Sequence, residues 1–133
     1  QAALKLGADN IINSRKAAIL PDSVDIAIDC VGIETTVNGS IDVVKKGGKV
    51  VLVGMGGDDR VPVNLNRAIG KEIDFATIFR YRNIFPTALK MVSDGKIDIN
   101  GIVSHTFDFS EIGKAMEFVM NNKNEVVKAV IKL

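Results

Sequence analysis

Short runs of apolar, β-branched residues alternate along the chain with segments in which apolar residues recur every three or four positions. The runs predict buried strands, and the periodic segments predict amphipathic helices. Strands are expected at residues 10–13, 24–31, 49–53, 72–79 and 125–133. Helices are expected at residues 1–6, 35–46, 86–93 and 110–121, with a helical turn at 67–71. Strands that alternate with helices indicate an α/β fold with a parallel sheet.

Composition narrows the class of protein. A chain of 133 residues has room for one ordinary domain. Its 17 basic and 16 acidic residues balance to a net charge of +1, which argues against a nucleic-acid or membrane-surface partner. No apolar run reaches the length of a membrane span, and no signal peptide is visible. The chain begins with Gln1 rather than methionine, so we expect a processed protein or a piece of a longer one.

Cysteine and histidine usage limits metal and redox chemistry. One cysteine cannot form an intrachain disulfide and is typical of a reducing compartment, so a cytoplasmic location is expected. One cysteine and one histidine cannot build a Cys/His zinc site from this chain alone. The lone histidine, His105, has no partner at motif spacing and is interpreted as structural. Cys30, which ends an apolar run, is interpreted as a small core residue.

The segments that follow the predicted strands are the first candidate site, because open parallel sheets bind ligands at the carboxyl ends of their strands. These segments read DCVG at 29–32, VGMG at 53–56 and FR at 79–80. Glycine allows a ligand to approach the backbone closely, although glycines after strands are also ordinary turns. Asp29 is either a cap of its turn or a ligand contact. Neither a G-x-G-x-x-G turn opening a helix nor a Walker loop is present, so no pyrophosphate site is expected.

Arg80 and Tyr81 are candidate ligand contacts beside the third strand. A guanidinium can bind substrate hydroxyls or a phosphate through its planar set of donors, or can form a surface salt bridge. The hydroxyl of Tyr81, the only tyrosine, can donate to a ligand or simply reach water.

An ordered series of motifs resembles one family over nearly the whole chain. Residues 6–9 (LGAD), 24–32 (VDIAIDCVG) and 47–54 (GGKVVLVG) resemble the second half of the coenzyme domain of medium-chain, zinc-dependent alcohol dehydrogenases. Residues 79–83 (FRYRN) and 102–107 (IVSHTF) resemble the sorbitol and xylitol (polyol) dehydrogenase branch of that family. The resemblance implies transfer of hydride from a polyol to NAD, assisted by zinc in a longer enzyme. NADP is not excluded, since the residue that selects between them is absent.

The resemblance also implies a domain division and a set of contacts. Residues 1–79 would be the C-terminal half of the NAD(P)-binding Rossmann domain, an incomplete parallel sheet. Residues 80–133 would return to the GroES-like catalytic domain. Arg80 and Tyr81 would contact the polyol. The expected cofactor-binding residues are Cys30, Val31, Gly32, Val53, Gly54, Met55, Ile78, Phe79 and Arg80.

The chain departs from the family pattern in ways that bear on activity. The zinc ligands, the pyrophosphate turn and the acidic ribose-binding residue of the family have no counterpart here. No catalytic residue or metal ligand is therefore expected in this chain, and the isolated chain is expected to be inactive. The alternatives are a stand-alone nucleotide-binding or assembly module and a zinc-free quinone reductase. The sequence upstream of Gln1 would distinguish them.

Strand order carries a further expectation. The family sheet runs 3-2-1-4-5-6, and this chain supplies counterparts of strands 3 to 6 only. Residues 10–13 would then lack a neighbouring strand, and residues 24–31 would form an open edge. Residues 72–79 would form the outer edge, where relatives extend the sheet between subunits. A homodimer or homotetramer through residues 72–79 is expected.

Overall fold

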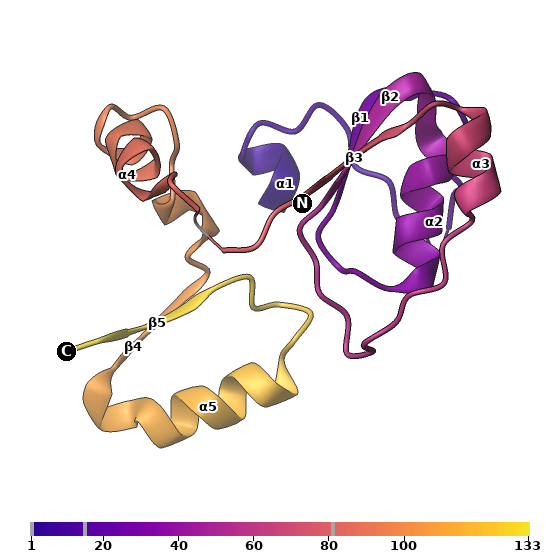
Figure 1. The fold of residues 1–133 in the computed structure, drawn as a ribbon. Coiled ribbons are helices and arrows are strands. Elements are labelled where there is room, and N and C mark those ends of the chain that lie inside the picture. The colour runs from indigo at the N-terminus through magenta and orange to yellow at the C-terminus, as the bar shows by residue number, and fades with distance from the viewer. Residues whose placement is uncertain (1, 15, 81) are drawn as a thin grey trace. The chain divides into compact units, whose positions relative to one another are not determined.

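The computed structural model describes residues 2–14, 16–80 and 82–133. They divide into two compact units (Figure 1). One consists of residues 12–83, and the other of residues 84–133 together with residues 1–11. The expected division at residue 79 concerns the domains of a longer protein and stays a prediction.

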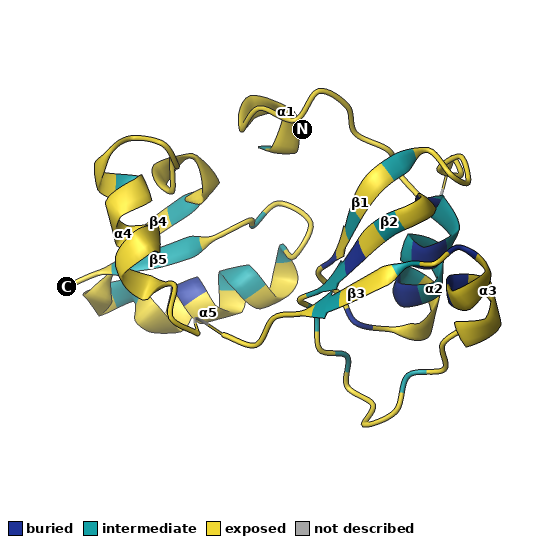
Figure 2. Cartoon of the chain, turned by 45° about the horizontal axis from the view of Figure 1, so that its top comes forward, coloured by how far each residue is buried: buried dark blue, intermediate teal, exposed yellow. Residues whose placement is uncertain are grey.

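The unit of residues 12–83 is built on a parallel sheet. Its strands β1 (Val24–Asp29), β2 (Val44–Leu52) and β3 (Asp74–Thr77) lie in the order β1-β2-β3. Helix α2 (Glu34–Val43) connects β1 to β2, and α3 (Leu65–Gly70) precedes β3. Both helices lie on the same face of the sheet (Figures 1 and 2). Such crossovers are what parallel neighbours require, and the predicted α/β class is confirmed.

The core of this unit lies where α2 meets the sheet (Figure 2). Val37 and Ile41, four residues apart on one face of α2, are buried. They are joined by Val44 and Val50 of β2 and by Ala68 of α3. On the opposite face of the sheet, the side chains of Ile26 and Ile28 are 58% and 63% exposed. They point to that face because side chains alternate along β1.

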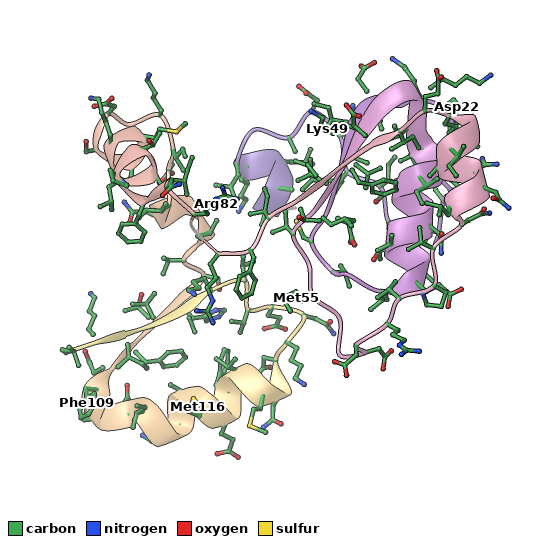
Figure 3. All side chains as sticks on the ribbon, viewed as in Figure 1. Asp22, Lys49, Met55, Arg82, Phe109 and Met116 are labelled. Atoms are coloured by element: carbon green, nitrogen blue, oxygen red, sulfur yellow. The ribbon has the colours of Figure 1, made fainter. Side chains whose placement is uncertain are left out.

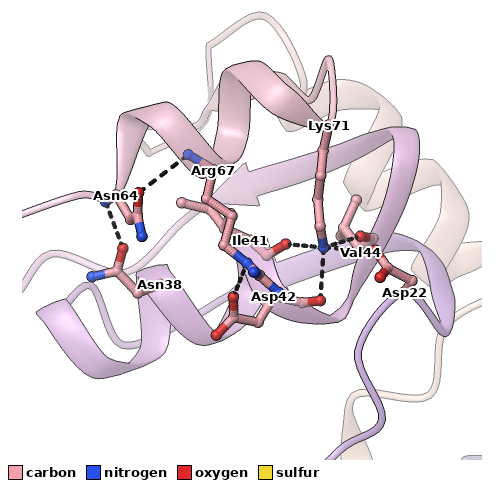
Figure 4. Close-up of polar contacts among 8 residues, drawn as sticks. All are labelled: Asp22, Asn38, Ile41, Asp42, Val44, Asn64, Arg67 and Lys71. Atoms are coloured by element: carbon pink, nitrogen blue, oxygen red, sulfur yellow. Dashed lines mark hydrogen bonds and ion pairs between the residues drawn. The ribbon is translucent and has the colours of Figure 1, made fainter.

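Helix α2 ends three residues earlier than the periodicity predicts. Val44 already pairs with Val24, and the register then shifts before Lys49 pairs with Ile26. The carbonyls at this end are bound by the N–H groups of Asp22 and Ser23 and by a buried ammonium group. The Nζ of Lys71 donates hydrogen bonds of 2.8 Å to the carbonyls of Ile41, Asp42 and Val44 (Figure 4). These carbonyls have no partner further along a helix that stops at Val43, so Lys71 caps the C-terminus of α2.

Asp22 completes this cap (Figure 4). Its Oδ1 lies 2.8 Å from the Nζ of Lys71, whose side chain is 8% exposed. The hydrogen bond to Lys71, which favours the charged carboxylate, lowers the pKa of Asp22. Arg67 of α3 also pairs with Asp42 at the end of α2. The cap therefore joins α2, α3 and the segment that precedes β1.

The expected strand at residues 10–13 is wrong. The described residues there form no strand, and Ile11 and Ile12 are both exposed. An extended segment needs a neighbouring strand for its backbone hydrogen bonds, and none is paired with it. The preceding helix, α1 (Ala2–Lys5), is present, and Gly7 follows it with a φ of 98°, as predicted for a C-terminal glycine.

The unit that contains residues 84–133 has its own two-stranded parallel sheet of β4 (His105–Asp108) and β5 (Ala129–Lys132). Helix α5 (Ile112–Asn121) lies between them in sequence, after the 3-10 turn η2 (Phe109–Glu111). Helix α4 (Phe85–Ser93) begins one residue before the predicted start, with Pro86 in its first turn, and is followed by η1 (Asn100–Ile102). The ring of His105 lies 5.0 Å from that of Phe118 and 6.4 Å from that of Phe107, which supports its structural interpretation.

Among the described residues, no helix combines the length and apolar character needed to cross a bilayer.

Candidate functional site

The three parallel strands β1, β2 and β3 end at the same edge of their sheet, and we call this the carboxyl edge. The turns that follow the strands there are residues 30–32, 53–57 and 78–80. Every candidate contact predicted within residues 12–80 lies in one of these turns. The parallel topology therefore brings together residues that are up to 50 positions apart in the sequence.

Asp29 connects the first two turns of the carboxyl edge. The residue is 4% exposed, and its two carboxylate oxygens each accept a 3.0 Å hydrogen bond, from the N–H groups of Val31 and Gly32. Its main-chain carbonyl accepts hydrogen bonds from the N–H groups of Val53 (2.9 Å) and Gly54 (3.0 Å). Of the two alternatives for this side chain, the structure shows the cap. The strand ends at Asp29, short of the predicted residue 31, because this cap turns the chain.

The glycines of the two turns are needed for their close approach. A Cβ at Gly32 would collide with the carbonyl of Gly54, and a Cβ at Gly54 would collide with the backbone of Val31. A Cβ at Gly56 would meet the carbonyl of Gly32. Gly32 also has a φ of 78°, which favours glycine. These glycines allow the backbones of the two turns to pack closely. Of the two interpretations given to them from the sequence, ligand approach and ordinary turns, the packing supports ordinary turns.

Exposed apolar side chains project from the same edge. Met55, which is labelled in Figure 3, is 77% exposed. Phe79 is 63% exposed, and Val31, Val53 and Ile78 are also exposed. Cys30 is exposed as well, so its interpretation as a core residue is wrong. The reason is that the strand ends at Asp29, which places Cys30 in the turn rather than in the sheet. A pocket of ≈ 320 Å³ lies beside these turns, lined by Asp29, Gly32, Leu52, Gly54 and Met55 among others.

Arg80 has an unusual backbone for a residue with a side chain. Its φ is 57°, in the left-handed region, and its guanidinium carbon lies 5.0 Å from the centroid of the Phe79 ring. Within residues 2–14, 16–80 and 82–133, no carboxylate forms an ion pair with Arg80, so the salt-bridge alternative finds no support. Strained backbone of this kind is concentrated at functional sites. Tyr81, the other predicted polyol contact, lies outside the described residues.

No described group of three or more histidine, cysteine, aspartate or glutamate side chains is arranged to hold a metal ion. The residues present in this part of the chain therefore do not fit a zinc site.

Two structural roles have no signal in the sequence: the helix cap formed by Lys71, and the hydrogen bonds that the main-chain carbonyl of Asp29 accepts from Val53 and Gly54. Nothing in the sequence distinguishes Lys71 from the other lysines. Its ammonium group reaches the end of α2 only in the folded structure. The side chain of Asp29 was noticed, but the role of its carbonyl in holding the second turn has no sequence signal. Aspartate two residues before a Val-Gly pair at the end of an apolar run is the one pattern that points to its capping role.

Comparison with known proteins gives the family of the chain, and its structural neighbours are Rossmann-like zinc dehydrogenases. Residues 1–94 match the model of the zinc-binding dehydrogenase family. This chain belongs to that family, whose members are oxidoreductases, and the resemblance to polyol dehydrogenases is confirmed.

Curated relatives and a solved structure agree with this family assignment. The chain is 31% identical, over 98% of its length, to the uncharacterized zinc-type alcohol dehydrogenase-like protein YdjJ of Escherichia coli. It is 30% identical, over 98% of its length, to the sorbitol dehydrogenase of Bacillus subtilis. A zinc-binding dehydrogenase of Sinorhizobium meliloti bound to NADP is 25% identical, with a TM-score of 0.82 over 98% of this chain and 41% of that chain. The chain spans 40% and 39% of the lengths of the two curated relatives.

Proposed function

We propose that this chain is the C-terminal portion of an NAD-dependent polyol dehydrogenase. The observation that carries the proposal is the carboxyl edge, where three turns from three parallel strands gather exposed apolar side chains, closely packed backbone and an arginine. The similarity of the chain, over 98% of its length, to a sorbitol dehydrogenase supports a polyol as the substrate class. NADP remains an alternative cofactor, and a solved relative is bound to it.

The residues of the carboxyl edge fit a dinucleotide. NAD supplies the acceptor for a hydride when it is bound. The turn of Cys30, Val31 and Gly32 would bind the adenosine half. The backbone of Val53, Gly54 and Met55 would hold the nicotinamide end, with Ile78 and Phe79 covering it and excluding water. The exposed side chains of Met55 and Phe79 suit a planar ring, because a bound ring would cover apolar surface that is exposed to water without it.

Arg80 would bind and orient the polyol, together with Tyr81. A guanidinium offers several donors in one plane, which matches the row of hydroxyls on a polyol. The left-handed backbone of Arg80 fixes where its side chain leaves the chain at the end of the turn that follows β3. Residues that bind zinc would belong to a part of the enzyme outside this chain, as would the turn that binds pyrophosphate.

The test compares the 133-residue chain with the longer protein that the proposal requires. Each is purified and mixed with NAD, zinc and either sorbitol or xylitol, and formation of NADH is followed by absorbance. We expect the longer protein to reduce NAD and the isolated chain to give no more NADH than a sample without protein. Turnover by the isolated chain would show that it holds a complete active site. Binding of NADH by the longer protein without turnover of any polyol would favour the alternative, a nucleotide-binding module.

A further inference from the structure

We propose that Asp29 is a positioning residue, which holds the turns after β1 and β2 in a single fixed arrangement for the cofactor. The inference rests on the proposed function, since it concerns the same carboxyl edge. Asp29 would not touch the cofactor. It would act through the backbone of residues 30–32 and 53–55.

Four N–H groups converge on this one residue. The carboxylate receives those of Val31 and Gly32, and the carbonyl receives those of Val53 and Gly54. Because two successive N–H groups donate to one buried carboxylate, the first turn has little freedom. The first turn is held by the side chain and the second by the main chain of the same residue. A shift of Asp29 therefore moves both.

Close packing of the two turns prevents them from adjusting independently. Gly32, Gly54 and Gly56 leave no room even for a methyl group between the turns. A displacement of the first turn is therefore transmitted to Gly54 and Gly56, on either side of Met55. The half of the site expected to bind adenosine and the half expected to bind nicotinamide are mechanically coupled through Asp29.

The other aspartate of β1 supplies a matched control. Asp25 is on the same strand and faces solvent, with its carboxylate 2.9 Å from the Nζ of Lys45 and a side chain that is 83% exposed. It makes no described contact with either turn. Replacing each aspartate by asparagine changes charge and shape equally, and only Asp29→Asn replaces an oxygen that accepts a buried N–H by a group that donates.

The experiment uses the longer protein of the proposed function, with Asp29→Asn and Asp25→Asn. NADH affinity is measured by fluorescence titration, the emission of bound NADH is recorded at saturation, and the melting temperature and both KM values are determined. We expect Asp29→Asn to weaken NADH binding about tenfold and to raise the KM for NAD, the size expected when one strong hydrogen bond is lost. The emission maximum of bound NADH should shift, and the KM for the polyol should stay near the wild-type value. Asp25→Asn should match the wild type in every readout.

The outcomes separate the inference from the proposed function. A wild-type protein that does not bind NADH would overturn both. Tight binding by the wild type with equal affinities and emission for the two variants would overturn the role of Asp29 alone. A lower melting temperature with unchanged NADH affinity and emission would show a structural role only, and would also overturn it. Should Asp29→Asn not fold, Asp29→Ser retains one oxygen acceptor for the turn, and failure of both to fold would assign Asp29 to folding rather than to positioning.

Discussion

The Nζ of Lys71 lies 2.8 Å from the Oδ1 of Asp22, at the end of the sheet opposite the carboxyl edge. Asp22 comes just before β1, and Lys71 comes just before β3. The same ammonium binds the carbonyls of Ile41, Asp42 and Val44, where α2 passes into β2. One side chain therefore fastens the amino ends of all three parallel strands.

Replacement of Lys71 by methionine should strongly destabilise the unit of residues 12–83. The methionine keeps the apolar stem but removes the ammonium donor from the carbonyls of Ile41, Asp42 and Val44. The carbonyl of Asp42 would still accept the N–H of Asp22. We expect a loss of about 3 kcal/mol in the free energy of unfolding, measured by urea denaturation. Lys45→Met, which removes an exposed ion pair with Asp25, should change stability by less than about 1 kcal/mol. Equal losses in the free energy of unfolding for the two variants would show that the buried cap contributes no more than an exposed ion pair.

Acid should weaken the same cap. Because the folded-state pKa of Asp22 lies below its ordinary value of 3.8, its bond to Lys71 contributes fully above that value. The contribution is lost as the pH falls through the lowered pKa. Urea midpoints measured from about pH 5 to about pH 2 should fall less steeply for Asp22→Asn than for the wild type. Parallel curves for the two proteins would contradict the assignment.

Substitution of Glu72 by glycine should stabilise the chain. Glu72 follows α3 with a φ of 53°, and its N–H donates to the carbonyl of Ile69 while that of Ile73 donates to Ala68. This is the arrangement in which helices usually end with glycine, since a Cβ is strained there. We expect Glu72→Gly to raise the free energy of unfolding by up to about 1 kcal/mol. Glu72→Ala keeps the Cβ and should give no gain, and a gain of equal size there would point to charge instead of backbone strain.

Arg80 should matter more than Arg82 for the polyol. Arg80→Lys retains the charge and loses the planar arrangement of donors, so we expect the KM for the polyol to rise about tenfold in the longer protein. Arg82→Lys should have little effect, because Arg82 lies two residues further from β3. Steady-state kinetics with sorbitol and xylitol would measure both. Similar, small changes would remove Arg80 from the substrate site.

The subunit contact expected at residues 72–79 can be tested at β3, which is an outermost strand of the described sheet and pairs only with β2 there. The N–H of Ile78 donates to the carbonyl of Leu52 on β2. Because N–H groups alternate in direction along a strand, that of Ala76 also faces β2, and that of Thr77 faces the open edge. Thr77→Pro should therefore reduce the oligomer to a folded monomer, measured by light scattering of the longer protein.

Ala76→Pro is the matched control for this test. It removes a donor directed at β2, so it should destabilise the sheet itself rather than the contact between subunits. A wild-type monomer, or an unaltered oligomer in folded Thr77→Pro, would place the subunit contact elsewhere.

Local patterns located β1, β2 and β3 because each strand contains apolar, β-branched or aromatic residues. They did not predict which faces are buried, since Ile26 and Ile28 are exposed while Val44 and Val50 are buried. The end of α2 could not be predicted, since the residues after Val43 continue an acceptable helical pattern. The carbonyls at its end are bound by groups far away in the sequence, the ammonium of Lys71 and the N–H groups of Asp22 and Ser23. Ile11 and Ile12 have the composition of a strand, but the partner that would pair with them is missing from the sheet. The candidate turns could be listed from sequence. Their fastening by Asp29 could not, because it depends on a main-chain carbonyl that every residue possesses.

The glycines at the carboxyl edge decide how this site can be re-engineered. A mutant library that varies residues 53–57 would return glycine at 54 and 56, because any side chain there would separate the two turns. Gly57 has open space around the position of a Cβ and would accept alanine. Met55 is the side chain of this loop that already projects freely into solvent. Diversity aimed at the group bound beside this loop should therefore be concentrated at position 55, where changes in size and polarity leave the close packing of the two turns untouched.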